Sequence, residues 1–400
     1  MTDRRSVLLA VLLFTMTASS FQIFAIAVLA VDLIADLEIS RTELGLLGSL
    51  NTAVGALTAP TMGRVTDRIG PRRSVLLVLL TSALRMALMA VATHWVVLAV
   101  AAAVSGCPQG WGNPTTNALI AERVPLEQQG TVTGIKQSGV QFGVFLSGLS
   151  LPGLALWLGW RGASWIFAGL FLASAILVVR GIGPAPVVSA EDQPTAAEEP
   201  GRRPIPSFIW VVSLYAFLFG SAGGAIGRFF PLWANEEIGL STVIAGALVA
   251  VGGLLGIVAR IWAGRVAQER IAPPRLLNLL ALIGALYCVV LLVTDTVGPW
   301  ILWPGALFYA VGIGAWNAVA MLAVITTVPK ASAGRASGIV MLGFLGGLSA
   351  GSPLAGLVVD RFDTYQPVWV GALVLSLMSA VVIRPPVLRW RRGGNQPSTA

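Results

Sequence analysis

Long apolar stretches of similar length, separated mostly by short polar turns, run through the whole chain. Twelve of them approach the roughly 20 residues that a helix needs to cross the hydrocarbon core of a bilayer. The first is too long for the apolar part of a signal peptide, so we expect an uncleaved first helix. The pattern predicts an all-α membrane protein with twelve transmembrane helices. The stretches cover residues 6–31, 44–62, 74–93, 95–119, 131–156, 162–183, 207–233, 241–262, 275–294, 298–327, 335–358 and 365–384.

One long polar segment, residues 184–206, interrupts this pattern near the midpoint. It is rich in Pro, Ala and Glu, a composition that cannot form a core and is typical of a flexible tether. We therefore predict two six-helix bundles, residues 1–183 and 207–400, joined by a cytoplasmic linker at 184–206. The second bundle ends in a short basic tail.

The two halves also repeat each other in sequence. At a constant offset of 204, residues 124–143 match residues 328–347. Duplicated apolar halves of this kind are the way in which many secondary transporters are built. The matched positions are Val124, Pro125, Gly130, Gly134, Ile135, Gly139 and Gly143, which recur as Val328, Pro329, Gly334, Gly338, Ile339, Gly343 and Gly347.

Composition and charge support a membrane protein rather than a soluble one. The chain is 56% hydrophobic and 11% charged, whereas soluble domains carry about 25% charged residues. The mean hydropathy is +0.82. A net charge of +8 would suit nucleic acid, but with the N-terminus inside, 19 of the 26 Lys and Arg face the cytoplasm and three face outward. This asymmetry predicts a multi-pass plasma membrane protein with both termini cytoplasmic, in a bacterial inner membrane.

The segment after the second apolar stretch, residues 63–73, reads GRVTDRIGPRR. It resembles the loop motif of the major facilitator superfamily, and the twelve spans, the duplication and the long central segment fit the same family. The resemblance covers nearly the whole chain. It implies a transporter whose two halves are latched in one state by this loop, with Asp67 and Arg68 at the matching positions. The second copy of the loop has Gln268 in place of the acid, so we expect the stronger latch in the first half.

General physical chemistry also predicts roles for the residues of this loop. A glycine permits a tight exit from a helix, an acid suits a helix N-terminus, and arginines bind acidic head groups or partner carboxylates. Alternatively, Arg72 and Arg73 serve only as topology anchors. The predicted latch consists of Gly63, Asp67, Arg68, Arg72 and Arg73.

Polar residues inside the predicted spans are costly and therefore mark a candidate site. Lys136, Gln137 and Gln141 form a polar cluster in the fifth span, with Gln137 and Gln141 on one helix face and Lys136 beside it. At the matched positions the second half has Val340, Met341 and Leu345. A central lysine present in one half only predicts an anion-binding charge. The alternative is a lysine that extends to the cytoplasmic water.

Three arginines also fall within spans. In the family, spans 1, 4, 7 and 10 line the cavity, so Arg228 in span 7 is placed to contact substrate; alternatively it pairs with Glu236 or Glu237 at the outer rim. Arg85 lies near the middle of span 3, which is usually peripheral in the family. Arg260, close to the end of span 8, is interpreted as structural.

Asparagines recur at matching places in the two halves. Asn113 and Asn117 share a face of span 4, and Asn317, next to Trp316, repeats Asn113. Such a pair could coordinate a substrate from two sides or form interhelical hydrogen bonds. The predicted substrate-binding set is Lys136, Gln137, Gln141, Arg228, Asn113, Asn117, Trp316, Asn317 and Arg85.

The acids are confined to loops and span ends, as is the single histidine, His94. No buried carboxylate or imidazole is thus available as a proton relay. Cys107 and Cys288 form no disulfide or metal-binding pattern, and no phosphate-binding loop with Gly-Lys-Ser/Thr is present. We expect no enzyme activity, no cofactor and no metal.

These features favour a monomeric transporter that contacts membrane lipids and moves a small anionic solute through a central cavity, by secondary active or facilitated transport. The alternative is proton-linked efflux of drugs or other lipophilic compounds. That alternative is disfavoured because span 4 lacks the arginine, and span 5 the proline, that such exporters usually carry.

Overall fold

The computed structural model describes residues 2–181, 205–328 and 330–384, and every element in these ranges is helical. The all-α prediction is confirmed. Most of the predicted linker and nearly all of the basic tail lie outside the described residues. The helices of the first half are α1 (Thr2–Val28), α2 (Ala30–Leu37), α3 (Arg41–Ile69), α4 (Pro71–Ala90), α5 (Trp95–Arg123) and α6 (Leu126–Gly181).

The second half begins with three long helices, continues through a segmented one and ends with two more. They are α7 (Ser207–Glu236), α8 (Thr242–Glu269), α9 (Pro273–Val297), η2 (Pro299–Ile301), α10 (Leu302–Tyr309), η3 (Ala310–Gly314), α11 (Ala315–Thr327), α12 (Lys330–Phe362) and α13 (Gln366–Val382).

Three local features interrupt the predicted runs. The first run breaks at Leu29, between α1 and α2. The fifth and sixth runs form α6, which bends at Gly159, where φ is +67° and favours glycine. The tenth run contains η3, a π-helical turn. A Cβ on Gly312 of η3 would lie 2.6 Å from the backbone nitrogen of Gly284, so only glycine allows α9 and η3 to approach this closely.

The described helices form a multi-pass membrane protein. Eight of them are long and apolar enough to cross a membrane, and α13 is a shorter apolar helix. Large apolar side chains also lie on the outer surface, for example Leu57 (78% exposed) and Trp157 (88% exposed). Exposed apolar surface on this scale indicates contact with lipid rather than water.

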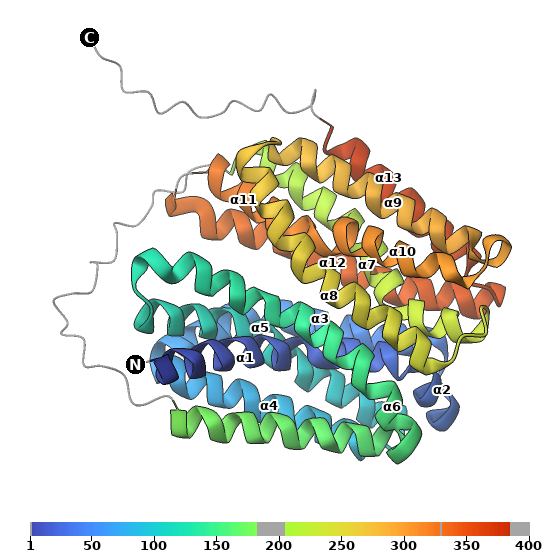
Figure 1. Ribbon diagram of the computed structural model, residues 1–400, viewed down its shortest axis with the longest axis horizontal. Coiled ribbons are helices and arrows are strands. Elements are labelled where there is room, and N and C mark those ends of the chain that lie inside the picture. Colours follow the sequence, from blue (N-terminus) through green and yellow to red (C-terminus); the bar gives the residue numbers. More distant parts are fainter. Residues whose placement is uncertain (1, 182–204, 329, 385–400) are drawn as a thin grey trace, which may run out of the picture.

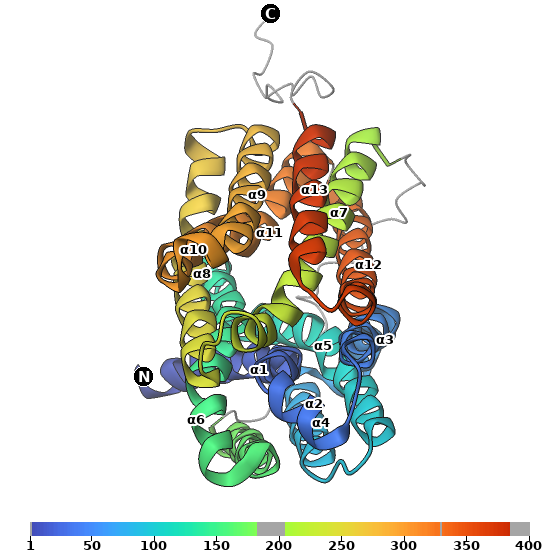
Figure 2. The same cartoon turned by 90° about the vertical axis from the view of Figure 1, so that its right-hand side faces the viewer.

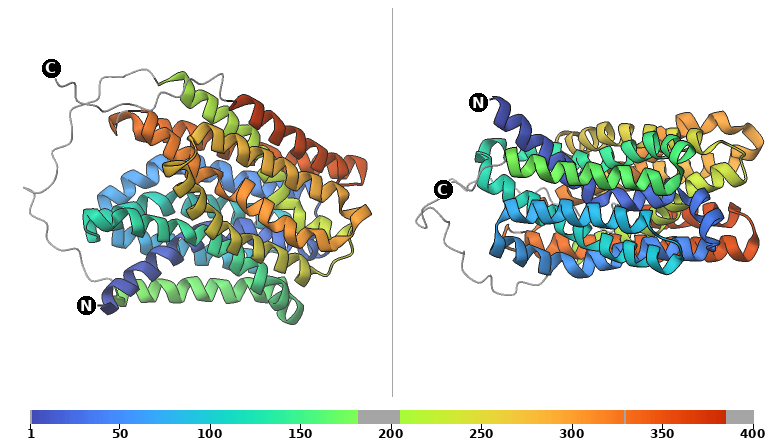
Figure 3. Two further views of the ribbon diagram at one scale, coloured as in Figure 1. Left: turned by 45° about the horizontal axis from the view of Figure 1, so that its top comes forward. Right: turned by 90° about the horizontal axis from the view of Figure 1, so that it is seen from below.

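The long helices run side by side along one direction, with α1–α6 in one half of the molecule and α7–α13 in the other (Figures 1 and 3). We call the end where α3 begins the Arg41 end, and the end where α3 turns into α4 the Gly70 end. Seen from the Arg41 end in Figure 2, α3 lies beside α12. The most extensive packing between the halves joins α3 to α12 and α6 to α8.

Glycines allow these two interfaces to close at the Arg41 end. A Cβ on Gly45 of α3 would lie 2.5 Å from the carbonyl oxygen of Ser352 of α12. A Cβ on Gly246 of α8 would likewise lie 2.5 Å from the carbonyl oxygen of Gly148 of α6. One buried apolar cluster continues from the first half into the Arg41 end of the second half, whereas the other is confined to the second half. The halves are therefore joined at the Arg41 end.

Candidate functional site

The predicted polar residues of spans 4 and 5 meet in the structure. Lys136 Nζ of α6 donates hydrogen bonds to Asn113 Oδ1 at 3.1 Å and to Asn117 Oδ1 at 2.6 Å, both on α5. Gln137 Nε2 donates to Asn113 Oδ1 at 3.0 Å. We call these four residues the Lys136 cluster. The asparagines are four residues apart and so lie on one face of α5, which lets one ammonium group contact both.

In the Lys136 cluster the lysine is buried, whereas the side chains around it are exposed or half-buried. Lys136 has no exposed surface, whereas Asn113 and Asn117 are exposed and Gln137 is half-buried. Within the described residues, no carboxylate forms an ion pair with Lys136. A buried charge without a counter-ion is costly unless hydrogen bonds or a ligand satisfy it. The two amide oxygens satisfy two of its three donors.

Gln141, the third polar residue predicted in span 5, points elsewhere. It is 6% exposed, and its side chain lies against Gly256 of α8 and Gly314 of η3, in the other half. A Cβ on Gly314 would lie 3.5 Å from Gln141 Nε2. The structure therefore places Gln141 at the contact between the halves and outside the Lys136 cluster.

The matched residues of the second half make a different contact. Asn317 Nδ2 lies 3.4 Å from Met341 Sδ, and these two residues stand where Asn113 and Gln137 stand in the first half. Trp316 is 2% exposed, and its ring centroid lies 4.5 Å from that of Phe344. Trp316 thus packs in the apolar cluster of the second half, while Asn317 is half-buried.

Arg228 is 3% exposed and reaches from α7 to the other half, where its Nη1 donates to the carbonyl oxygen of Ile23 at 3.3 Å. Its guanidinium group also lies against the backbone of Gly48 in α3. The alternative in which Arg228 pairs with Glu236 is wrong, because Glu236 pairs with another arginine. Arg228 therefore lies at the contact between the halves and outside the Lys136 cluster.

The other two arginines donate to backbone carbonyl groups within their own half. Arg85 has no exposed surface; its Nη1 donates to Ser105 Oγ at 2.7 Å, and its Nη2 donates to the carbonyl oxygen of Ala18. Arg260 Nε donates to the carbonyl oxygen of Gly314 at 2.8 Å. These contacts join helices α4, α5 and α1 in the first half, and α8 and η3 in the second.

The structure places the predicted latch residues differently from the sequence prediction. Gly63 lies inside α3, so the interpretation of Gly63 as the helix exit is wrong; the turn is at Gly70, where φ is +84°. Asp67 and Arg68 are exposed in the last turn of α3, a helix C-terminus rather than the N-terminus expected for Asp67. Arg72 Nη2 donates to the carbonyl oxygen of Val179 at 3.0 Å.

Arg73 is exposed. Among the described residues, no ion pair links the predicted latch to the second half. The latch residues therefore make no charged contact between the halves in this state.

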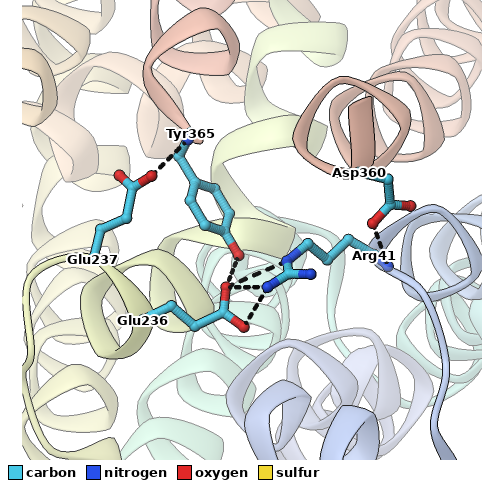
Figure 4. A network of polar contacts seen from close by, with 5 residues as sticks. All are labelled: Arg41, Glu236, Glu237, Asp360 and Tyr365. Atoms are coloured by element: carbon cyan, nitrogen blue, oxygen red, sulfur yellow. Dashed lines mark hydrogen bonds and ion pairs between the residues drawn. The ribbon is translucent and has the colours of Figure 1, made fainter. Parts of the chain in front are cut away.

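A charged contact that sequence reasoning missed joins the halves at the Arg41 end (Figure 4). Arg41 Nη2 lies 2.9 Å from Glu236 Oε1 and 3.0 Å from Oε2, and Arg41 Nε lies 3.3 Å from Oε2. Tyr365 Oη donates to Glu236 Oε2 at 2.5 Å. Burial lowers the pKa of Arg41, but its interactions with Tyr365 and Glu236 outweigh this and raise the pKa above its ordinary value.

Asp360 at the end of α12 caps the N-terminus of α3 in the other half. Its carboxylate accepts from the backbone nitrogens of Arg41 at 3.1 Å and Thr42 at 2.8 Å. Ser40 and Glu43 satisfy the neighbouring donors through a capping box. An acid at a helix N-terminus is favoured by the unpaired N–H groups and the helix dipole. We call Arg41, Thr42, Glu236, Asp360 and Tyr365 the outer lock.

The comparisons with known proteins give the family. A family model described as "Major Facilitator Superfamily" matches residues 9–347. This chain belongs to the major facilitator superfamily. It is 28% identical over 370 residues to the "Probable nitrate/nitrite transporter NarK2" of Mycobacterium tuberculosis (strain ATCC 25618 / H37Rv), covering 88% of this chain and 90% of that protein.

Two further likenesses bear on function and fold. The chain is 26% identical over 261 residues to the "Multidrug resistance protein MdtG" of Serratia proteamaculans (strain 568), covering 64% of this chain and 62% of that protein. Among solved structures, an inward-facing, unoccupied bacterial homolog of the human lysosomal transporter Spinster superposes with a TM-score of 0.79. It shares 16% identity and covers 96% of this chain and 97% of that one. Membership of the family, shown by the family model, makes this chain a membrane transporter of small molecules.

Proposed function

We propose that this protein is a plasma membrane transporter that moves a small anion by alternating access, and that the Lys136 cluster binds the anion. The observation that carries the proposal is a buried lysine whose hydrogen-bond partners, among the described residues, are the amide oxygens of two asparagines with exposed side chains. A charge held in this way in a membrane protein is a functional-site hypothesis by default. The relative named for nitrate and nitrite transport supports an anionic substrate.

The proposed topology has twelve spans. Eight helices meet the length and hydropathy required of a span, and one of these, Val132–Arg180, is long enough to cross twice with its bend at Gly159. The helices α3, α5 and α13 supply the remaining three. The basic residues gather at the Gly70 end, and the positive-inside rule makes that end cytoplasmic. The Arg41 end then faces the outside of a bacterial inner membrane.

The state of the molecule in this proposal is inward-facing. Between the halves, the outer lock and the glycine contacts at Gly45 and Gly246 all lie toward the Arg41 end. At the Gly70 end, a Cβ on Gly134 or on Gly338 would meet no atom within 4 Å. The Lys136 cluster is then reached from the cytoplasmic side.

The transport cycle follows from these two ends. When the anion binds the Lys136 cluster, it neutralises the charge that otherwise resists closure around a dry site. The halves then rock, the outer lock opens, and the loop formed by Gly63, Asp67, Arg68, Arg72 and Arg73 closes the cytoplasmic end. The exposed state of Asp67 and Arg68 in the present structure suits a latch that engages only in the opposite state.

Coupling to a proton, if present, would have to come from the substrate. Lys136 has no carboxylate partner within the described residues, and the sequence has its acids at loops and span ends. An anion could enter with its own proton, exchange against another anion, or move down its gradient. We therefore propose facilitated transport, exchange or substrate-borne proton symport rather than a relay of side chains.

Uptake into proteoliposomes tests the proposal. Purified full-length protein is expected to give saturable uptake of labelled nitrate, nitrite, formate or acetate, because each offers a negative charge to Lys136. Lipophilic cations such as ethidium should not be transported when a proton gradient is imposed across the membrane. Transport of ethidium without transport of any anion would contradict the proposal and support drug efflux, the alternative that the likeness to MdtG favours.

A further inference from the structure

We propose that the Lys136 cluster selects a small oxoanion with a single negative charge, such as a carboxylate or a nitrate-like ion. It would discriminate against dianions and against anions rich in hydroxyl groups. This inference rests on the proposed function and specifies the substrate class of the same site. It follows from how the hydrogen-bond donors, acceptors and charges of the cluster are used.

The lysine fixes the orientation of both asparagine amides. An ammonium group has three N–H donors and no acceptor, so the amide oxygens of Asn113 and Asn117 must face Lys136, as they do. The Nδ2 groups of both asparagines consequently point away from the lysine. Asn113 Oδ1 accepts a second hydrogen bond from Gln137 Nε2, which uses its remaining acceptor capacity.

The rim of the cluster thus presents mainly donors to a ligand. These are the amide NH₂ groups of Asn113 and Asn117, together with the third N–H of Lys136, and only the Gln137 Oε1 atom is left as a side-chain acceptor. Carboxylate or nitrate oxygens accept hydrogen bonds and match this set. A sugar would bring several hydroxyl donors that these four side chains cannot satisfy, and an unpaired buried donor is costly.

Among the described residues of the spans, Lys136 alone presents its positive charge directly to such a ligand. The other cations in the spans are engaged elsewhere: Arg85 donates to Ala18 and Ser105, Arg228 donates to Ile23, and Arg260 donates to Gly314. The matched position in the second half adds none, because Val340 stands where Lys136 stands.

A dianion would therefore leave one charge uncompensated when the halves close around the site and exclude water. The free-energy cost of such a charge falls on divalent ligands alone. The site is therefore expected to prefer monovalent anions because of their charge, independently of their size.

Binding to the purified full-length protein tests this inference, with nitrate, formate, sulfate and glucose 6-phosphate as probes at constant ionic strength. Ligand-induced thermal stabilisation is expected to show nitrate and formate binding about tenfold or more tightly than sulfate and glucose 6-phosphate. Equal or tighter binding of the dianions would overturn the inference and leave the proposed function intact. If no anion binds and none is transported, the proposed function fails as well.

Variants that change the charge count sharpen the test. Asn113→Asp keeps the shape but neutralises the cluster, and we expect formate binding to weaken about 10- to 100-fold. The matched Asn317→Asp, whose partner is Met341, should weaken it several times less. Gln137→Lys adds a second cation within the cluster and should raise sulfate binding about tenfold relative to formate. An unchanged ratio in the folded variant would overturn the charge argument; if Gln137→Lys fails to fold, Gln137→Arg makes the same test.

Discussion

The two halves of the molecule share their packing but differ in chemistry at one matched place. Gly139 packs against the backbone of Leu13 in α1, and its repeat partner Gly343 packs against the backbone of Ser213 in α7. At the neighbouring turn, however, Lys136 and Gln137 contact asparagine amides, whereas the matched Met341 contacts Asn317 through sulfur. The close helix contacts, which depend on glycine, are present in both halves, whereas at this matched place only the first half carries a buried charge.

The two interfaces between the halves likewise share their glycine contacts but differ in their charged contacts. The contact of Gly246 with Gly148, between α8 and α6, corresponds to the contact of Gly45 with Ser352, between α3 and α12, because Ser352 follows Gly148 by 204 residues and Gly246 follows Gly45 by 201. Only the second interface carries the outer lock (Figure 4). The shared glycine contacts close the Arg41 end, and the charged contacts add to one side of it.

Removing the charge that distinguishes Lys136 from its matched residue Val340 should have the largest effect. Lys136→Met keeps the length of the side chain, and we expect anion uptake to fall about 100-fold because a hydrogen bond to a charged group contributes up to about 3 kcal/mol. The unfolding temperature should stay the same or rise, since an unpaired buried charge is removed.

The matched variant Met341→Leu should change uptake by no more than about twofold, because volume-conserving apolar changes are well tolerated. Proteoliposome uptake and thermal unfolding of both variants check these values. If Lys136→Met transports normally but unfolds at a lower temperature, the lysine stabilises the fold and does not bind the anion.

The next largest effect should come from the interface glycines. Gly45→Ala and Gly246→Ala each introduce a methyl group 2.5 Å from a carbonyl oxygen of the other half, which forces the Arg41 end apart. We expect uptake to fall about tenfold as the inward-facing state loses roughly 1.4 kcal/mol.

Labelling reports the shift directly. In a background without Cys107 and Cys288, Ser49→Cys should react faster with an impermeant maleimide when either glycine is replaced, because Ser49 lies at the α3–α12 contact with Ser349. Gly134→Ala and Gly338→Ala are the matched controls, since a Cβ there meets no atom within 4 Å. Equal labelling in all four variants would show that these interfaces do not govern access.

Much of this fold and part of the site could be predicted from sequence, because apolar run length and the internal repeat are local properties. Lys136 and Gln137 were identified as candidates by the same repeat, since they have no polar counterpart in the second half, but Gln141, grouped with them from sequence, points elsewhere. The orientation of Asn113 and Asn117 toward the lysine needed the structure. Their spacing showed a shared helix face but not the helix that packs on it.

Other predictions failed for identifiable reasons. Gly63 was chosen as the helix exit, but the pair Gly70–Pro71 was the better signal, because glycine followed by proline commonly ends one helix and begins another. Arg228 and Glu236 are close in sequence, yet eight residues of helix separate them by about 12 Å. Glu236 instead pairs with Arg41, which is 195 residues away and in the other half. Such a pairing depends on how two bundles meet in one state, and no local pattern encodes it.

The smallest effect, and the sharpest test of the difference between the two interfaces, should come from the Arg41–Glu236 pair. Its side chains are 28% and 27% exposed, so we expect a coupling of about 0.5–1 kcal/mol in a double-mutant cycle of Arg41→Gln and Glu236→Gln. Loss of this coupling energy should make Ser49→Cys react about two- to fivefold faster with an impermeant maleimide added from outside. The ion pair Arg161–Asp36, at 2.7 Å, lies at the same end but within the first half. Asp36→Asn should leave the labelling rate unchanged, because its loss alters no contact between the halves; a rate raised equally by Asp36→Asn would mean that surface charge, and not the lock, controls opening.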